Sequence, residues 1–128
     1  MKLDLLYEID APKPWGKPHP HGQREREQKA FGDAIEQIKL ADKLGFNTVW
    51  AVEHHFREGR SHSPAPEVLL GALTQVTEQI GLGFGVTLTP FGFTHPARIA
   101  EKVATVDILS KGRVQWGKIG RASCRERV

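Results

Sequence analysis

The sequence predicts an α/β fold, namely the first half of a (β/α)₈ barrel with about four strands and three helices. Apolar segments of strand character start near residues 3, 47, 80 and 113, at intervals of about 44, 33 and 33. Single helical patterns separate these segments, so neighbouring strands have to pair in parallel through right-handed crossovers. A doubly wound nucleotide-binding sheet usually carries a glycine-rich turn after its first strand. Here that turn is rich in proline and the glycines lie inside the third strand, which favours the barrel.

The first two strands flank a long amphipathic helix. Residues 3–9 are a short apolar run and predict a strand, and residues 11–22 predict a loop because they contain four prolines and two glycines. From about residue 24 to residue 44, apolar side chains recur at helical spacing, and Gly45 follows as a C-terminal cap. Residues 47–53 are β-branched and aromatic with few charges, which is typical of a strand covered on both faces.

The second helix and the third strand follow a polar loop. Ser63 before Pro64 predicts a helix N-terminus, because serine caps helices and proline favours their first turn. Residues 80–88 predict a buried strand with glycines at alternating positions. Alternating glycines on one face indicate that a backbone or a ligand approaches that face closely.

The third helix and the start of a fourth strand complete the pattern. Thr94 is expected to cap a helix that begins at His95-Pro96 and ends before Gly112. Residues 113–117 begin the fourth strand. Arg113 lies at the amino end of that strand, where we expect a surface ion-pair partner rather than a catalytic group.

The composition is that of one soluble domain, for which we expect a cytoplasmic location. The 128 residues are 39% hydrophobic and 26% charged, enough for a modest core. No apolar run reaches the ~20 residues of a membrane helix. Asp4 interrupts the only apolar start, which argues against a secretory signal. The single cysteine, Cys124, excludes a disulfide framework and a cysteine-based zinc site.

The basic charge is confined to the last eleven residues. The net charge is +3, but residues 118–128 hold four basic side chains against Glu126 alone, and the rest of the chain is balanced. We therefore expect neither a nucleic-acid nor a membrane partner. These residues lack helical or strand periodicity, so we divide the chain into a barrel half, 1–117, and a tail, 118–128, that is expected to be non-native.

Three segments carry a resemblance to a known family. They are WAVEHHF at 50–56, IGLGFGVTLTPFGFTHPARIAEKVATVDILSKGRV at 80–114, and VQWG at 114–117. Their order and spacing resemble the bacterial luciferase-like flavin-dependent monooxygenase family. The resemblance covers residues 1 to about 117.

The resemblance implies a (β/α)₈ barrel that uses reduced FMN, or in some branches the deazaflavin F420. Such an enzyme oxidises a small organic substrate with O₂, and a flavin reductase supplies the reduced flavin. The parent protein is expected to be able to form a homo-oligomer. Since a barrel needs eight strands and this chain shows four, we expect the chain to be a truncated part that is inactive alone.

Three residues at the end of the second strand are candidates for the chemistry. Glu53, His54 and His55 lie at the barrel face where active sites are built. Imidazole exchanges protons near neutral pH. Adjacent strand residues point to opposite faces, so the two histidines should differ in role. The resemblance implies that His54 is nearest the chemistry, with His55 and Glu53 around it.

Four residues on and after the third strand are candidates for binding the cofactor. Gly85 and Thr87, with Gly83, could leave room for a flat flavin ring, although small residues also relieve crowding inside a barrel. Thr89 and Pro90 lie where the resemblance implies backbone contacts to the flavin.

A metal-dependent barrel hydrolase is the alternative function. His19 and His21 form a His-x-His pair after the first strand, and His54, with Glu53 or His62, could add ligands. The pair lies in a proline-rich loop some ten residues beyond the strand, which fixes ligand geometry poorly. We therefore expect no metal site.

Overall fold

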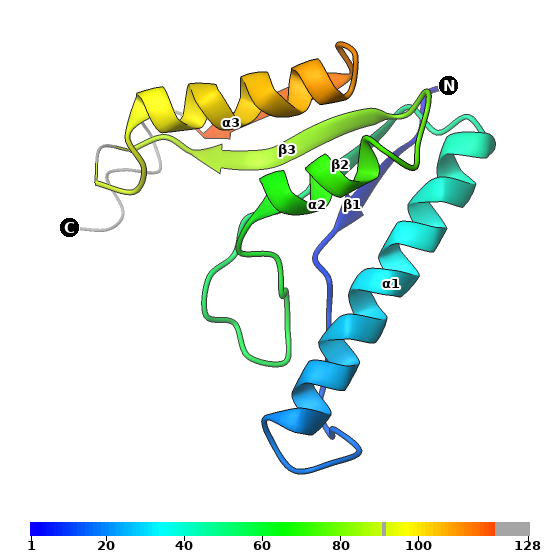
Figure 1. The fold of residues 1–128 in the computed structure, drawn as a ribbon, viewed down its shortest axis with the longest axis vertical. Helices are drawn as coiled ribbons and strands as arrows, with labels where there is room; N and C mark the ends of the chain where they lie inside the picture. The colour runs from blue at the N-terminus through cyan, green and yellow to red at the C-terminus, as the bar shows by residue number, and fades with distance from the viewer. Residues whose placement is uncertain (91, 120–128) are drawn as a thin grey trace.

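In the computed structural model, strands and helices alternate along the chain, as the spacing predicts (Figure 1), and the described residues form four strands and three helices. The structure describes residues 1–90 and 92–119. The elements are β1 (Asp4–Tyr7), α1 (His21–Lys43), β2 (Thr48–Ala51), α2 (Pro66–Leu73), β3 (Gly81–Leu88), α3 (Pro96–Leu109) and β4 (Val114–Ile119). Strand β4 includes Lys118 and Ile119, the first two residues of the expected tail. The remainder of that tail, 120–128, lies outside the described residues.

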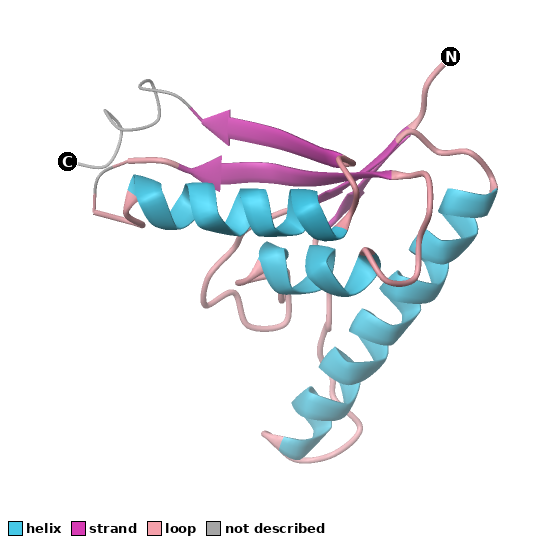
Figure 2. Cartoon of the chain, turned by 45° about the horizontal axis from the view of Figure 1, so that its top comes forward, coloured by secondary structure: helices cyan, strands magenta, loops and turns pink. Residues whose placement is uncertain are grey.

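The sheet topology distinguishes between the two α/β architectures. The strand order is β1-β2-β3-β4 and all three pairings are parallel. The helices lie along one face of this sheet (Figure 2). A doubly wound sheet reverses its strand order and carries helices on both faces, whereas a barrel winds in one direction with its helices outside. The fold is therefore half of a (β/α)₈ barrel, as predicted.

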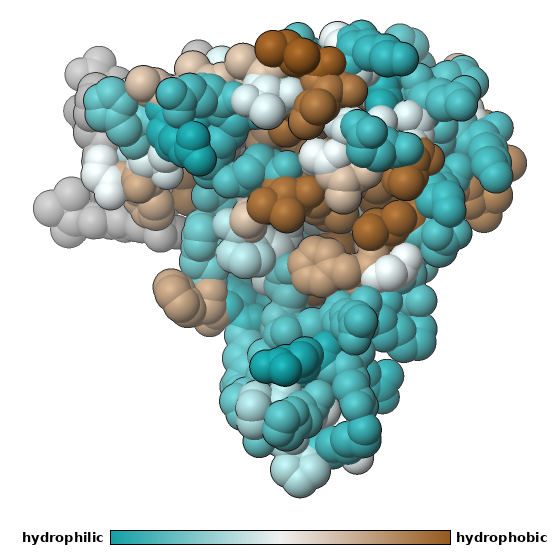
Figure 3. All heavy atoms as spheres, in the orientation of Figure 1, coloured by the Kyte–Doolittle hydropathy of each residue, from teal (hydrophilic) through white to brown (hydrophobic). Residues whose placement is uncertain are grey.

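The hydrophobic core fills the space between the sheet and the helices. Val49, Leu82 and Phe84 point from the strands toward the helix layer, where Ile38 and Leu70 are fully buried. Apolar side chains gather over α2 and its borders with α1 and α3, whereas the amino-terminal part of α1 is hydrophilic (Figure 3). Within the described residues, no helix has the length and apolar character that crossing a membrane requires.

The helix starts differ from the expected caps. Helix α2 begins at Pro66 after Ala65, and the Ser63 hydroxyl instead donates to the Val52 carbonyl (2.7 Å). Helix α3 is capped by His95, whose Nδ1 accepts from the Ala97 N–H (3.2 Å), and not by Thr94. In both helices proline occupies the first turn, as its fixed φ favours.

Asp42 and Arg113 join the elements at the amino end of the sheet. The Asp42 carboxylate accepts from three backbone N–H groups, those of Glu78, Gln79 and Ile80 (2.7–2.9 Å). Burial raises the pKa of Asp42, but these three hydrogen bonds and the charge of Arg113 outweigh it, so the pKa lies below its ordinary value.

The expectation that Arg113 is a surface ion-pair partner is wrong. Its guanidinium donates to the carbonyls of Ile80 (2.9 Å), Thr77 (3.1 Å) and Ser110 (2.9 Å). These carbonyls belong to the segments before β3 and β4, so Arg113 ties the two turns together.

The glycines of β3 make room for a tryptophan of the neighbouring strand. A Cβ added at Gly83 would lie 2.4 Å from Cε3 of Trp50, and one at Gly85 would lie 3.0 Å from its Cβ. The indole Nε1 donates to Asp4 Oδ2 (2.9 Å), which holds the ring across the sheet face opposite the helices. The close approach is therefore made by the Trp50 side chain and not by a backbone or a ligand, so the space expected for a flavin ring beside Gly83 and Gly85 is taken by the indole.

Replacing Gly83 with alanine is expected to destabilise the chain by about 2 kcal/mol, because Trp50 has to move and overpacked sites cost this much. Urea unfolding measures the change. Gly32→Ala is the matched control: nothing lies within 4 Å of its added Cβ, and alanine in helix α1 is expected to stabilise by about 0.5–1 kcal/mol. Equal stability of Gly83→Ala and wild type would contradict the packing of Trp50 on this glycine.

Candidate active site

A cavity of about 410 Å³ opens where β2 and β3 end, at the carboxyl edge of the parallel sheet. We call it the mouth cavity, and its lining residues are Glu53, His54, His55, Arg57, Gly85, Val86, Leu88 and Phe93. It brings all three candidate catalytic residues together with one candidate cofactor residue, Gly85. The carboxyl ends of the strands are where (β/α)₈ barrels build their active sites.

The two histidines of this cavity have different partners. Strand β2 ends at Ala51, so Glu53, His54 and His55 lie in the following loop and not on the strand. His55 Nε2 lies 3.2 Å from Glu53 Oε1, and the side chain of His55 is more exposed than that of Glu53. His54 Nδ1 instead lies 2.5 Å from the Ser61 hydroxyl. The two histidines therefore have different contacts, but not because they alternate along a strand, since both follow the end of β2.

The loop after β2 folds back and is anchored to the segment that follows β1. The His54 N–H donates to the Ser63 carbonyl (3.0 Å), and the His62 N–H donates to the Ile9 carbonyl (2.8 Å). The Asp10 carboxylate accepts from the Ser61 N–H (2.8 Å). Asp10 and Ser61 therefore anchor the loop that carries the candidate residues, and the sequence pattern did not point to either of them.

A second cavity, of about 490 Å³, lies between this loop and α1, and we call it the loop cavity. His62 lines it, with Nδ1 2.8 Å from Glu27 Oε1, and Glu27 also accepts from Gln23 Nε2 (2.7 Å). The other ring nitrogen of His62 is buried and has no hydrogen-bond partner within residues 1–90 and 92–119. His54 lines both the loop cavity and the mouth cavity.

The other candidate cofactor residues lie apart from Gly85. The pairing of β3 with β4 shifts register between Phe84 and Thr87, which interrupts the alternation of side chains. Thr87 is buried, accepts from Trp116 Nε1 (3.1 Å) and lines a small hollow with residues of α3. Thr89 and Pro90 follow β3, and the Pro90 carbonyl accepts from the Phe93 N–H (3.2 Å).

The histidines of the alternative metal site are brought together only in part, since His19, His54 and His62 line the loop cavity and His21 does not. His21 is the exposed first residue of α1, and the His19 ring lies against Trp15, with ring centroids 5.5 Å apart. In the described part of the chain, no group of three or more histidine, cysteine, aspartate or glutamate residues could hold a metal ion.

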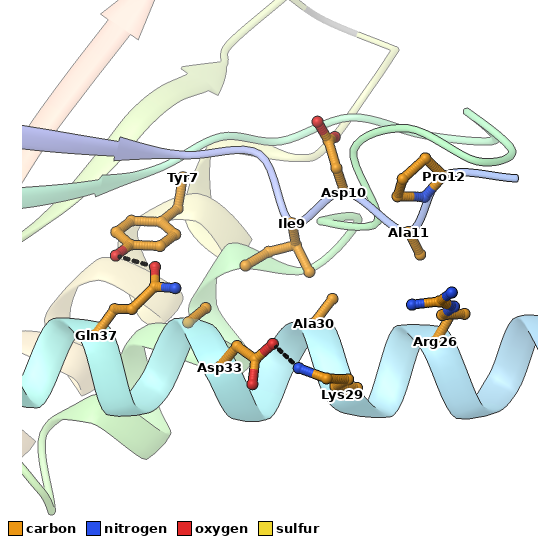
Figure 4. A pocket seen from close by; sticks show the side chains of 11 residues that line it. Tyr7, Ile9, Asp10, Ala11, Pro12, Arg26, Lys29, Ala30, Asp33 and Gln37 are labelled. Atoms are coloured by element: carbon orange, nitrogen blue, oxygen red, sulfur yellow. Dashed lines mark hydrogen bonds and ion pairs between the residues drawn. The ribbon is translucent and has the colours of Figure 1, made fainter.

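A third cavity, of about 290 Å³, lies between α1 and the segment after β1, and we call it the helix cavity (Figure 4). Tyr7 donates to Gln37 Oε1 (3.0 Å) at one end, and Lys29 pairs with Asp33 on α1. Asp10, which anchors the loop after β2, lines it, but none of the site residues that the sequence predicts does. The helix cavity therefore serves as a control site when ligand binding at the mouth cavity is measured.

Comparison with known proteins identifies the family. A profile described as luciferase-like monooxygenase matches residues 15–123. The chain belongs to the luciferase-like monooxygenase family. This confirms the resemblance that the three sequence segments carry.

Relatives within the family use more than one cofactor. The chain is 30% identical over 94 residues to the oxygenase component of the flavin-dependent trigonelline monooxygenase of Acinetobacter baylyi, covering 73% of this chain and 25% of that protein. It is 38% identical over 93 residues to the F420-dependent glucose-6-phosphate dehydrogenase of Beutenbergia cavernae, covering 71% of this chain and 27% of that protein.

A solved structure has the same arrangement of elements. The monooxygenase RslO1 of Streptomyces bottropensis is 32% identical with a TM-score of 0.74, and the match covers 92% of this chain and 32% of that protein. The chain thus spans about a third or less of the length of each of these three family members.

Proposed function

We propose that the chain forms the first half of the barrel of a flavin-dependent monooxygenase, with the mouth cavity as the flavin end of the active site. The observation that carries the proposal is the meeting of Glu53, His54 and His55 with Gly85 in one cavity at the carboxyl edge of the sheet.

The lining of the mouth cavity fits a flat ring with polar edges. Glu53, His54 and His55 supply hydrogen-bonding groups on the side of β2. Val86, Leu88 and Phe93 supply apolar surface on the side of β3. Ligand sites usually combine apolar walls with a few polar groups that fix orientation. The isoalloxazine ring, or the corresponding deazaflavin ring of F420, has this distribution of polarity.

The reduced flavin would supply the electrons for reaction of O₂ with a small organic substrate. His54 would hold and exchange a proton at the edge of the ring, since imidazole does so near neutral pH. Glu53 orients His55 through their contact at 3.2 Å, so this pair would shape the wall beside His54. Arg57 would add positive charge at the rim.

Reduced FMN is the proposed cofactor, with F420 as the alternative within the family. The flavin-dependent relative is named as an oxygenase component, which supports a separate flavin reductase as the partner that supplies reduced flavin. The F420-dependent dehydrogenase has a higher sequence identity to this chain than the flavin-dependent monooxygenase has, so F420 has to be tested directly beside FMN.

Flavin titration tests the proposal. We expect the 128-residue chain to bind FMN more weakly than micromolar, because later strands and loops of the barrel usually hold the cofactor phosphate. The product of the complete reading frame, read from genomic DNA beyond the Gly117 codon, is expected to bind FMN at micromolar concentration or below. Binding of F420 but not of FMN would make F420 the cofactor in place of FMN. Binding of neither cofactor by that product would contradict the proposed function.

A further inference from the structure

Ser61 holds His54 from a buried position in the loop after β2. Ser61 is 2% exposed and its hydroxyl lies 2.5 Å from His54 Nδ1. Within residues 1–90 and 92–119, this ring nitrogen is the only hydrogen-bond partner of the hydroxyl. The contact joins residues seven apart in a loop with no regular secondary structure.

The backbone around Ser61 is fixed in an uncommon conformation. Its φ is +57°, in the left-handed region that non-glycine residues rarely adopt. The Asp10 carboxylate accepts from its N–H, and the neighbouring His62 N–H is bound to the Ile9 carbonyl. Two long-range hydrogen bonds therefore hold the residue in this conformation, where its hydroxyl meets the ring.

The direction of the hydroxyl hydrogen follows from burial. Buried hydroxyls generally donate to an acceptor, and His54 Nδ1 is the partner that residues 1–90 and 92–119 offer the Ser61 hydroxyl, which favours the hydroxyl as the donor. A neutral imidazole that accepts at Nδ1 carries its proton on Nε2. Since Ser61 occupies Nδ1, Nε2 is the ring nitrogen left for another partner, and His54 lines the mouth cavity whereas Ser61 does not.

We propose that Ser61 is a positioning residue that fixes the Nε2–H tautomer of His54 and presents this N–H as a proton donor to the mouth cavity. The inference rests on the proposed function for its role in the reaction, but the tautomer itself is a property of the chain that can be measured without turnover. A hydrogen-bonded neighbour is the usual device by which proteins choose between the two histidine tautomers.

Long-range ¹⁵N–¹H correlation spectra of the ¹⁵N-labelled 128-residue chain test the proposal. They are recorded at about pH 8.5, where an ordinary imidazole is neutral, and His54→Gln assigns the ring. The wild-type ring is expected to show one tautomer, with the proton on Nε2 and an Nδ1 shift displaced by the hydrogen bond it accepts. In Ser61→Gly this displacement is expected to be lost. Glycine tolerates a positive φ, so this variant removes the hydroxyl and keeps the loop conformation.

Ser63→Ala is the matched control, because it removes a buried hydroxyl of the same loop that donates to Val52 and not to His54. Its His54 signals are expected to equal those of wild type. A wild-type proton on Nδ1, or identical His54 signals in wild type and Ser61→Gly, would overturn the proposal. If the tautomer is as proposed but His54 proves dispensable for turnover, the proposed function fails and the positioning contact stands.

Discussion

Replacing His54 with alanine is expected to lower flavin-dependent kcat/KM of the complete reading-frame product by about two to four orders of magnitude. General acid–base groups contribute this much when they transfer a proton in the transition state. The loss is expected mainly in kcat, because the ring acts on the reacting atoms rather than on ground-state binding. Steady-state oxygen consumption with a flavin reductase and a panel of small organic substrates measures the effect.

His21→Ala is the control for this prediction. His21 is exposed at the start of α1 and contributes to neither the mouth cavity nor the loop cavity. Its replacement is expected to change kcat/KM by less than about twofold. Equal losses in both variants would favour a shared metal centre, and full activity of His54→Ala would remove His54 from the proposed chemistry.

Replacing Asp42 with alanine is expected to reduce the free energy of unfolding by about 3 kcal/mol. The substitution takes the acceptor from three backbone N–H groups, of which that of Ile80 is buried, and buried donors without a partner cost about 1–3 kcal/mol each. It also leaves Arg113 without the nearby negative charge. Urea unfolding of the 128-residue chain, monitored by circular dichroism, measures the loss.

The pH dependence of this effect has a defined sign. The pKa of Asp42 is lower in the folded chain than its ordinary value of 3.8, so its contribution is present above that value and is lost as the pH falls through the folded pKa. The stability difference between wild type and Asp42→Ala should therefore shrink in acid. Asp33→Ala, which breaks an exposed pair on α1, is expected to change stability by less than about 0.5 kcal/mol at any pH. A similar loss in both variants would contradict the role given to Asp42.

The elements of the fold could be predicted because they depend on local patterns. Helical spacing, β-branched runs and proline positions predict each of the seven elements found in the described residues, although the predicted caps at Ser63 and Thr94 are wrong. Those two errors have a common cause. Each residue is a good capping type, but the chain reaches the helix two residues or one residue later, where proline sets the first turn.

Long-range contacts explain what the sequence did not predict. Asp10 and Ser61 are 51 positions apart, and no local pattern relates them. Strict alternation along β3 would place Thr87 on the same face of the sheet as Gly85. The register shift between Phe84 and Thr87 instead turns Thr87 toward α3, and the sequence pattern does not reveal this shift. The sequence does not reveal the contacts of Arg113, because its carbonyl partners belong to turns that pack together only in the folded chain.

Mapping flavin onto the chain tests the central assignment most directly. Oxidised FMN is titrated into the ¹⁵N-labelled 128-residue chain, and amide shifts locate even weak binding. We predict amide shifts at Glu53 to Arg57 and at Gly85 to Leu88, around the mouth cavity. We predict none at residues that line the helix cavity, such as Tyr7, Asp33 and Gln37. Shifts confined to the helix cavity, or none at the mouth cavity up to the solubility of FMN, would contradict the assignment of the flavin site.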